Sequence, residues 1–100
     1  MIKHIVFFKV AAPMSAADKA SLLNTVSQRL NELPGLIPEI SRFEVGINMV
    51  DDIKAADLVL VSEFESAGAL QSYQSHPAHQ AFLMWNKDKC PKFSVVDYLF

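Results

Sequence analysis

The chain has 100 residues, the length of one domain spanning residues 1–100, which is enough to bury a hydrophobic core. Hydrophobic residues make up 51% of the chain and charged residues 20%, a balance that excludes a disordered chain. The net charge of −2 excludes a protein that is drawn electrostatically to nucleic acid or to anionic lipid.

The first half of the chain predicts a strand, a helix and a second strand. Residues 2–10 are β-branched and aromatic, and this run is too short for a helix. Ser15 is in the position of a helix N-cap, and leucines then recur at helical spacing until the Pro-Gly pair at 34–35 ends the helix. Residues 41–47 alternate between apolar and polar side chains, which predicts a half-buried strand.

The second half predicts a strand, two helical segments and a last strand. Residues 58–64 form an apolar run typical of a strand, and Ser66 follows as the N-cap of a short helix. His76-Pro77 interrupts that helix, because proline suits the first turn of a new helix and not the middle of an old one. Residues 78–89 form the second segment, and residues 93–100 the last strand. The order is β-α-β-β-α-β, which predicts an α+β, ferredoxin-like fold.

The strands carry apolar side chains on both faces. In the first strand, Ile5 and Phe7 point away from Val6 and Phe8, and the third and last strands show the same pattern. One helical layer can cover only one face, so the second apolar face indicates an interface. We expect a homodimer that packs sheet against sheet, with Ile5 and Phe7 at the interface, because His4 should face the helices.

The residues best suited to chemistry lie between the two helical segments. Tyr73, His76 and His79 share one short run, and His4 is the third of the three histidines. Imidazole and phenol groups donate or accept protons, imidazole near neutral pH. His79 lies one turn before the apolar pair at 82–83, so its side chain should face inward with them.

The chain gives no sign of export or membrane insertion. Lys3 and Lys9 bracket the apolar run 5–8, which is too short for the core of a signal peptide. No stretch approaches the ~20 apolar residues of a membrane span. The single cysteine, Cys90, cannot form an internal disulfide. Its simplest interpretation is a small, half-buried residue that serves packing. We therefore expect a cytoplasmic protein.

Several segments together resemble one known family. They are residues 2–9, 57–61 and 64–66, the run Tyr73-x-x-His76-Pro-Ala-His79, the Pro-Gly pair at 34–35 and Asp97-Tyr98. This ordered set is similar to the stress-responsive α/β-barrel (Dabb) domain, over essentially the whole chain. The resemblance implies a ferredoxin-like protomer that pairs into a dimeric α+β barrel.

The resemblance also implies candidate site residues. In olivetolic acid cyclase, a plant polyketide cyclase of this family that needs no cofactor, the catalytic pattern is similar to His4, Tyr73 and His79 here. His79 would act as the base, Tyr73 as a proton donor to an enolate oxygen, and His4 would orient His79 or bind substrate oxygen. That cyclase has a histidine where this chain has Leu58, which implies a more apolar pocket here.

We therefore expect a pocket between the sheet and the second helical region, lined by His4, Tyr73 and His79. The further ligand-binding residues that we expect are Phe8, Leu58, His76, Phe82 and Leu83. The expected ligand is a small apolar or polyketide-like molecule, and no metal or cofactor is expected. The expected partner is a second copy of the chain.

Each candidate residue also has a structural alternative. His79 is equally consistent with a buried neutral histidine that ties helix to sheet, Tyr73 with a core tyrosine, and His4 with a strand-end histidine bonded to backbone. His76 is most simply a helix N-cap, although the three histidines could also be combined into a metal site. Two functions remain open, a non-catalytic binding protein and a cyclase or lyase. They differ in whether the polar side chains converge on an open cavity.

Overall fold

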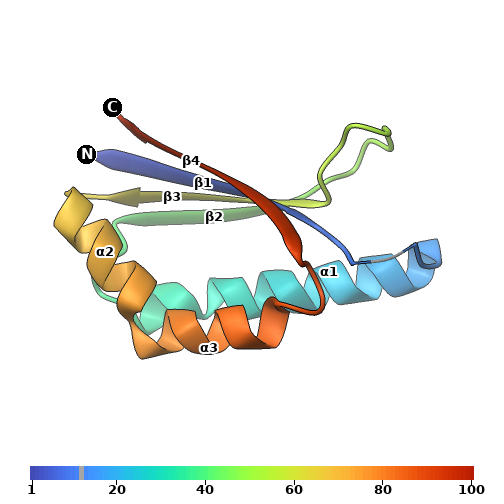
Figure 1. Ribbon diagram of the computed structural model, residues 1–100, viewed down its shortest axis with the longest axis horizontal. Helices are drawn as coiled ribbons and strands as arrows, with labels where there is room; N and C mark the ends of the chain where they lie inside the picture. Colours follow the sequence, from blue (N-terminus) through green and yellow to red (C-terminus); the bar gives the residue numbers. More distant parts are fainter. Residues whose placement is uncertain (12) are drawn as a thin grey trace.

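The fold is an antiparallel sheet covered by helices on one face. The computed structural model describes residues 1–11 and 13–100. The elements in chain order are β1 (Ile2–Lys9), α1 (Ala16–Asn31), the 3-10 turn η1 (Leu33–Gly35), β2 (Arg42–Ile47), β3 (Leu58–Phe64), α2 (Ala67–Ser75), α3 (Pro77–Asn86) and β4 (Lys92–Leu99). Figure 1 shows α1, α2 and α3 on the same side of the sheet. This arrangement confirms the predicted ferredoxin-like β-α-β-β-α-β order.

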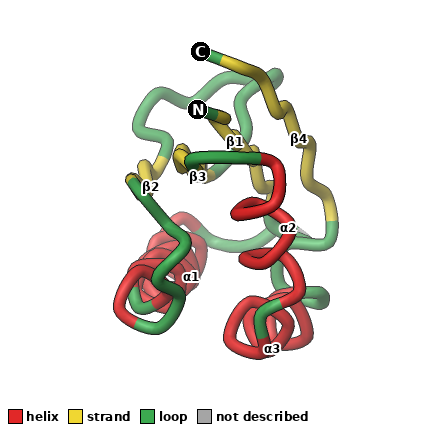
Figure 2. The backbone as a smooth tube through the Cα atoms, turned by 90° about the vertical axis from the view of Figure 1, so that its left-hand side faces the viewer, coloured by secondary structure: helices red, strands yellow, loops and turns green. Residues whose placement is uncertain are grey.

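The strand order in the sheet is β2-β3-β1-β4, and all neighbouring strands are antiparallel. Viewed along the strands, α1 lies beneath β2 and β3, whereas α3 lies toward the β4 side (Figure 2). The two helical regions therefore cover different halves of one sheet face, and the layer between them and the sheet contains the core.

The helices begin where the sequence predicts. The Ser15 hydroxyl accepts a hydrogen bond from the backbone of Asp18, and the Ser66 hydroxyl accepts one from Ala69, each at 3.1 Å. Such caps satisfy backbone N–H groups that have no partner within the helix. Between α2 and α3 the helix is interrupted at His76, and α3 starts with proline in its first turn.

Among the described residues, no helix combines the length and hydropathy needed to cross a membrane.

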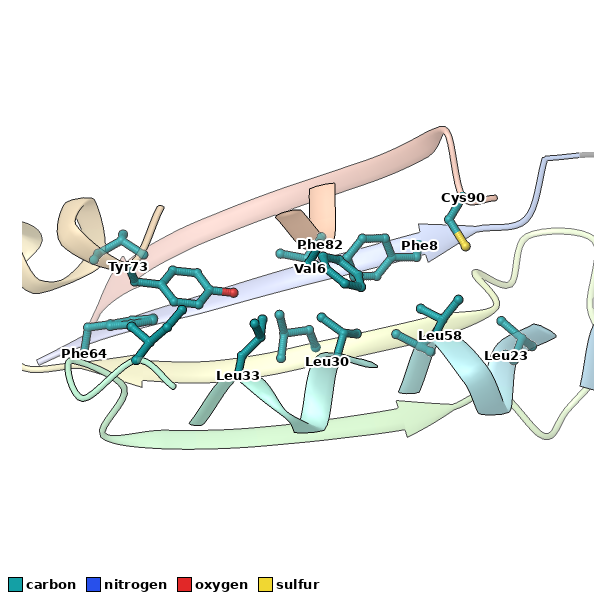
Figure 3. Packing of buried hydrophobic residues seen from close by; sticks show 14 residues of the cluster. Val6, Phe8, Leu23, Leu30, Leu33, Leu58, Phe64, Tyr73, Phe82 and Cys90 are labelled. Carbon is teal, nitrogen blue, oxygen red and sulfur yellow. The ribbon is translucent and has the colours of Figure 1, made fainter. Parts of the chain in front are cut away.

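The core lies on the helix-facing side of the sheet. Val6 and Phe8 of β1 and Leu60 of β3 are all at most 6% exposed. The remaining buried hydrophobic residues are Leu23, Val26, Leu30, Leu33, Ile37, Leu58, Phe64, Leu70, Tyr73, Phe82 and Cys90. Figure 3 shows many of these side chains filling the layer between sheet and helices.

The opposite sheet face is also apolar, and in the single chain it is open to solvent. Phe7 is 42% exposed, Val96 52% and Tyr98 43%. The strand register places Ile5 beside Val61 on this face. We call the outer face the surface formed by Ile5, Phe7, Val59, Val61, Val96 and Tyr98. The predicted two-sided apolar pattern is therefore present, and Ile5 and Phe7 lie opposite the helices as expected.

One buried carboxylate, just before β3, links helix α1 to the residue that follows β1. Asp57 is 4% exposed, and its Oδ1 lies 2.7 Å from Lys19 Nζ of α1. Its Oδ2 accepts a hydrogen bond from the backbone N–H of Val10 at 2.8 Å. Burial alone raises the pKa of Asp57, but the hydrogen bonds from Lys19 and Val10, with the positive charges of Lys19 and Lys9, hold it below its ordinary value.

Asp57→Asn should destabilise the protein at pH 7 by about 1.5 kcal/mol, because a charge-assisted hydrogen bond to Lys19 is lost. For a domain of this size the melting temperature should fall by roughly 8 °C. Since the folded-state pKa is depressed, the stabilisation is present above the unfolded pKa and disappears as pH falls through the folded one. Thermal melts from pH 7 to pH 2 should show the two proteins converging below the ordinary value of 3.8. Asp88→Asn, at a side chain that is 76% exposed, is the control and should change little.

Candidate functional site

A cavity of about 390 Å³ opens between the sheet and the α2–α3 region. It lies beneath β1 and β4, and helices α1, α2 and α3 contribute to its wall. The lining residues are His4, Val6, Phe8, Leu30, Leu60, Tyr73, Gln74, His79, Phe82, Leu83, Asn86, Lys87, Cys90, Pro91, Phe93 and Val95. The wall is largely apolar, with few polar groups, which is the usual character of a small-molecule site.

Six of the eight residues expected at the site line this cavity. His4, Tyr73 and His79 come from three different elements, yet their rings lie close together in the cavity wall. The predicted apolar residues Phe8, Phe82 and Leu83 also contribute to the wall.

The structure does not bring Leu58 and His76 to the cavity. Leu58 is 1% exposed and is paired with Phe8 across β1 and β3, but it is not among the residues that line the cavity. The inference that Leu58 makes the pocket more apolar is therefore wrong. His76 Nδ1 accepts a hydrogen bond from the backbone N–H of Ala78 at 3.0 Å, so its ring is used to cap α3.

His4 is held by a carboxylate on the neighbouring strand. It is 5% exposed, and its Nδ1 makes a hydrogen bond to Asp97 Oδ1. A carboxylate only accepts, so Nδ1 carries the proton and Nε2 of a neutral His4 keeps its lone pair. The sequence analysis named Asp97 only among the residues that resemble the family and gave it no role at the site. Strand β1 pairs antiparallel with β4, and this register places His4 directly opposite Asp97. Predicting that the first and last strands pair would have identified this contact.

Tyr73 is at the centre of an aromatic cluster. Its ring centroid lies 4.5 Å from that of His79, 4.9 Å from that of Phe64 and 6.1 Å from that of His4. Burial raises the pKa of the Tyr73 phenol, so the hydroxyl stays protonated at neutral pH and is available as a donor. Figure 3 shows this hydroxyl pointing along the layer between the sheet and the helices.

His79 is half-buried and held in one orientation. Its Nδ1 lies 2.9 Å from the backbone carbonyl oxygen of Gln74. Because a carbonyl only accepts, Nδ1 must donate, and this leaves the Nε2 lone pair of a neutral ring free to take a proton. Burial lowers the pKa of His79, the hydrogen bond to Gln74 raises it, and the nearby His4 lowers it; the net direction is downward. His79 is therefore neutral at pH 7, as a general base must be.

The geometry does not support a three-histidine metal site. His4 and His79 line the cavity, whereas the His76 ring is occupied with the α3 backbone. Within residues 1–11 and 13–100, no group of three or more histidine, cysteine, aspartate or glutamate side chains is arranged to hold a metal ion. The arrangement offers a neutral imidazole, a protonated phenol and a histidine held by a carboxylate, all in the wall of an apolar cavity.

Comparison with known proteins identifies relatives over the full length. Residues 2–100 match the family model described as the stress responsive A/B barrel domain, Dabb. An uncharacterised protein of Streptomyces coelicolor is 31% identical over 101 residues, which cover all of both chains. A crystal structure from Bacteroides fragilis, described as a dimeric protein of unknown function with a ferredoxin-like fold, is 30% identical, with a TM-score of 0.86 over 99% of this chain and 95% of that one.

A hydroxynitrile lyase from Passiflora edulis has the same fold. Its TM-score is 0.81 over 99% of this chain and 92% of the lyase, at 18% identity. At that identity the likeness shows the shared fold alone.

Proposed function

The chain belongs to the stress responsive A/B barrel (Dabb) family, and from this we propose that it is a homodimer in which each chain binds a small, largely apolar ligand. The observation that carries the proposal is the 390 Å³ apolar cavity on which His4, Tyr73 and His79 converge. A filled core would leave no such space, because protein interiors pack to the density of organic crystals.

Two observations support the homodimer. The outer face exposes large apolar side chains from strands β1 and β4, including Phe7, Val96 and Tyr98. Burial of such a surface against a second copy, about a two-fold axis, would remove it from water. The Bacteroides fragilis protein, 30% identical over nearly the whole chain, is described as dimeric.

An enzyme that needs no cofactor is the second candidate, and the state of His79 favours it. The Nε2 of neutral His79 would remove a proton from a carbon next to a substrate carbonyl, and the Tyr73 hydroxyl would hydrogen-bond the enolate oxygen that forms. The enolate carbon would then attack a second carbonyl and close a ring, with the proton returned to the new alkoxide. This is the chemistry of the polyketide cyclase that the sequence resembles, and a lyase would run the same proton transfers toward bond cleavage.

The binding proposal is tested by blocking the cavity. Leu83 lines the cavity and is 39% exposed, so tryptophan at this position has room to fill the opening without displacing the core. Leu83→Trp should weaken binding of para-hydroxybiphenyl, measured by isothermal titration calorimetry, at least tenfold. Met84→Trp introduces the same side chain at a neighbouring position that is 66% exposed and outside the cavity wall, so it should leave the affinity unchanged. Equal affinities for the two variants and the native protein would place the binding site elsewhere.

A further inference from the structure

The lining residues of the cavity fall into two groups by exposure. Those of the interior, such as Val6, Phe8 and Tyr73, are buried. The exposed ones form the rim of the opening, which consists of Gln74, Leu83 and Lys87 on the helical side and Pro91, Phe93 and Val95 on the strand side. A ligand that enters the cavity therefore passes between the helices and β4.

Lys87 is the one permanently charged side chain on the rim, within residues 1–11 and 13–100. The described lining residues include no aspartate, glutamate or arginine. Burial raises the pKa of the Tyr73 phenol and of the Cys90 thiol, so both stay protonated and uncharged at neutral pH. The opening of an otherwise apolar cavity therefore carries a positive charge that the cavity wall does not neutralise.

The end of α3 does not need Lys87 as a cap. A lysine near a helix C-terminus ordinarily stabilises the last carbonyl groups, and here Lys89 has that role. Its Nζ donates a hydrogen bond to the carbonyl oxygen of Trp85 at 2.9 Å, and it also lies 3.3 Å from Asp88 Oδ1. None of the ion pairs among the described residues includes Lys87. Its ammonium group is therefore available to a ligand.

The spacing along α3 relates Lys87 to the base. Lys87 follows His79 by eight residues and its backbone is still helical, with φ −60° and ψ −29°, so the two residues lie roughly 12 Å apart along the axis. Leu83, also on the rim, lies one turn before Lys87 on the same side of the helix. The flexible apolar stem of a lysine can pack along such a neighbour while the ammonium group stays in water at the opening.

We propose that Lys87 selects ligands that carry a carboxylate, and that it holds this carboxylate at the rim of the cavity. The ligand class is then an elongated organic acid with an apolar ring or chain as its body. One polar group meets His79 and Tyr73, and the carboxylate lies roughly 12 Å away. In the apolar interior a carboxylate would lose its water without meeting a cation, whereas at the rim it keeps part of its hydration and pairs with Lys87. The inference rests on the proposed function of the cavity and adds which ligands that cavity selects.

The test uses two probes of nearly the same shape that differ in charge. They are para-(para-hydroxyphenyl)benzoate and the corresponding neutral benzamide. The native protein should bind the benzoate roughly fivefold more tightly by isothermal titration calorimetry at low ionic strength, because only the benzoate forms an ion pair with Lys87. Lys87→Met keeps the length of the side chain but removes its charge. In this variant the preference for the benzoate should disappear, while the affinity for the benzamide stays unchanged.

Two further variants are the controls. Lys87→Arg keeps the positive charge at the rim and should keep the preference for the benzoate. Lys54→Met removes one positive charge from the exposed connection between β2 and β3, outside the cavity wall, and should keep it as well. Equal loss of the preference in Lys54→Met and Lys87→Met would attribute it to the net charge of the protein and overturn the inference.

Thermal stability separates a ligand contact from a structural lysine. Because Lys87 is exposed, ligand-free Lys87→Met should melt at nearly the native temperature. A lower melting temperature, with both probes weakened equally, would identify a structural role and overturn the inference. Equal binding of the benzoate and the benzamide by the native protein would overturn this inference alone. Failure of both probes to bind would also remove the binding function on which it rests.

Discussion

Aspartate in place of Phe7 should abolish the dimer. Phe7 lies on the outer face, opposite Val59 of β3, and is 42% exposed in the single chain. In a two-fold dimer each interface residue occurs twice, so the substitution would bury two unpaired carboxylates. The cost is several kcal/mol for each buried charge, enough to dissociate an interface of ordinary affinity. Light scattering coupled to size-exclusion chromatography at micromolar concentration should give the dimer mass for the native protein and the monomer mass, or an unfolded chain, for Phe7→Asp.

The control places the same charge on the opposite side of the molecule. Met84 is 66% exposed on α3, so Met84→Asp should remain dimeric and fully folded. A Phe7→Asp protein with the dimer mass and the native melting temperature would show that the outer face is not the interface.

If the cavity is catalytic, His79→Ala should strongly slow proton transfer from carbon. A simple probe is the exchange of the methyl protons of acetophenone for deuterium in heavy water, followed by NMR. A positioned general base contributes ~10²–10⁴-fold, so loss of the His79 imidazole should lower the protein-catalysed exchange by that factor. Tyr73→Phe removes only the hydroxyl and keeps the ring contacts with His79 and Phe64, so it should lower the rate less and leave the melting temperature nearly unchanged.

The pH dependence provides a check that is independent of mutagenesis. The active form of His79 is the neutral ring, and its pKa is lowered from 6.5. The exchange rate should therefore be at its plateau at pH 8 and should reach half of that plateau only at a pH below 6.5. A folded His79→Ala protein that exchanges acetophenone at the native rate would end the catalytic interpretation, and the dimeric binding function would remain.

The sequence predicted the fold well because its signals were local. Alternating side chains identified the faces of the strands, and Ser15 and Ser66 identified the helix starts through bonds to backbone only three residues away. The break at His76-Pro77 follows from proline chemistry alone. The apolar outer face was predicted by the same logic, since one helical layer cannot cover both sides of a sheet.

The site was predicted less completely, because it depends on contacts between distant segments. His4 and Asp97 are 93 residues apart, and only the pairing of β1 with β4 brings them together. The pattern of β3 places Leu58 on the helix-facing side but does not reveal which helix lies over it. The sequence did not predict that Asn86 lines the cavity, because a polar residue at a helix end normally faces solvent and its burial depends on how α3 packs against the sheet.

A crystal structure of the protein with para-hydroxybiphenyl tests the central claim most directly. We expect one ligand in each chain of a dimer that is joined through the outer faces. The biphenyl body should lie against Phe8 and Phe82, with its hydroxyl within hydrogen-bond distance of His79 or Tyr73. A phenol bound outside the cavity, with the space between the sheet and α3 closed by side chains, would contradict the claim that this protein holds a small apolar ligand there.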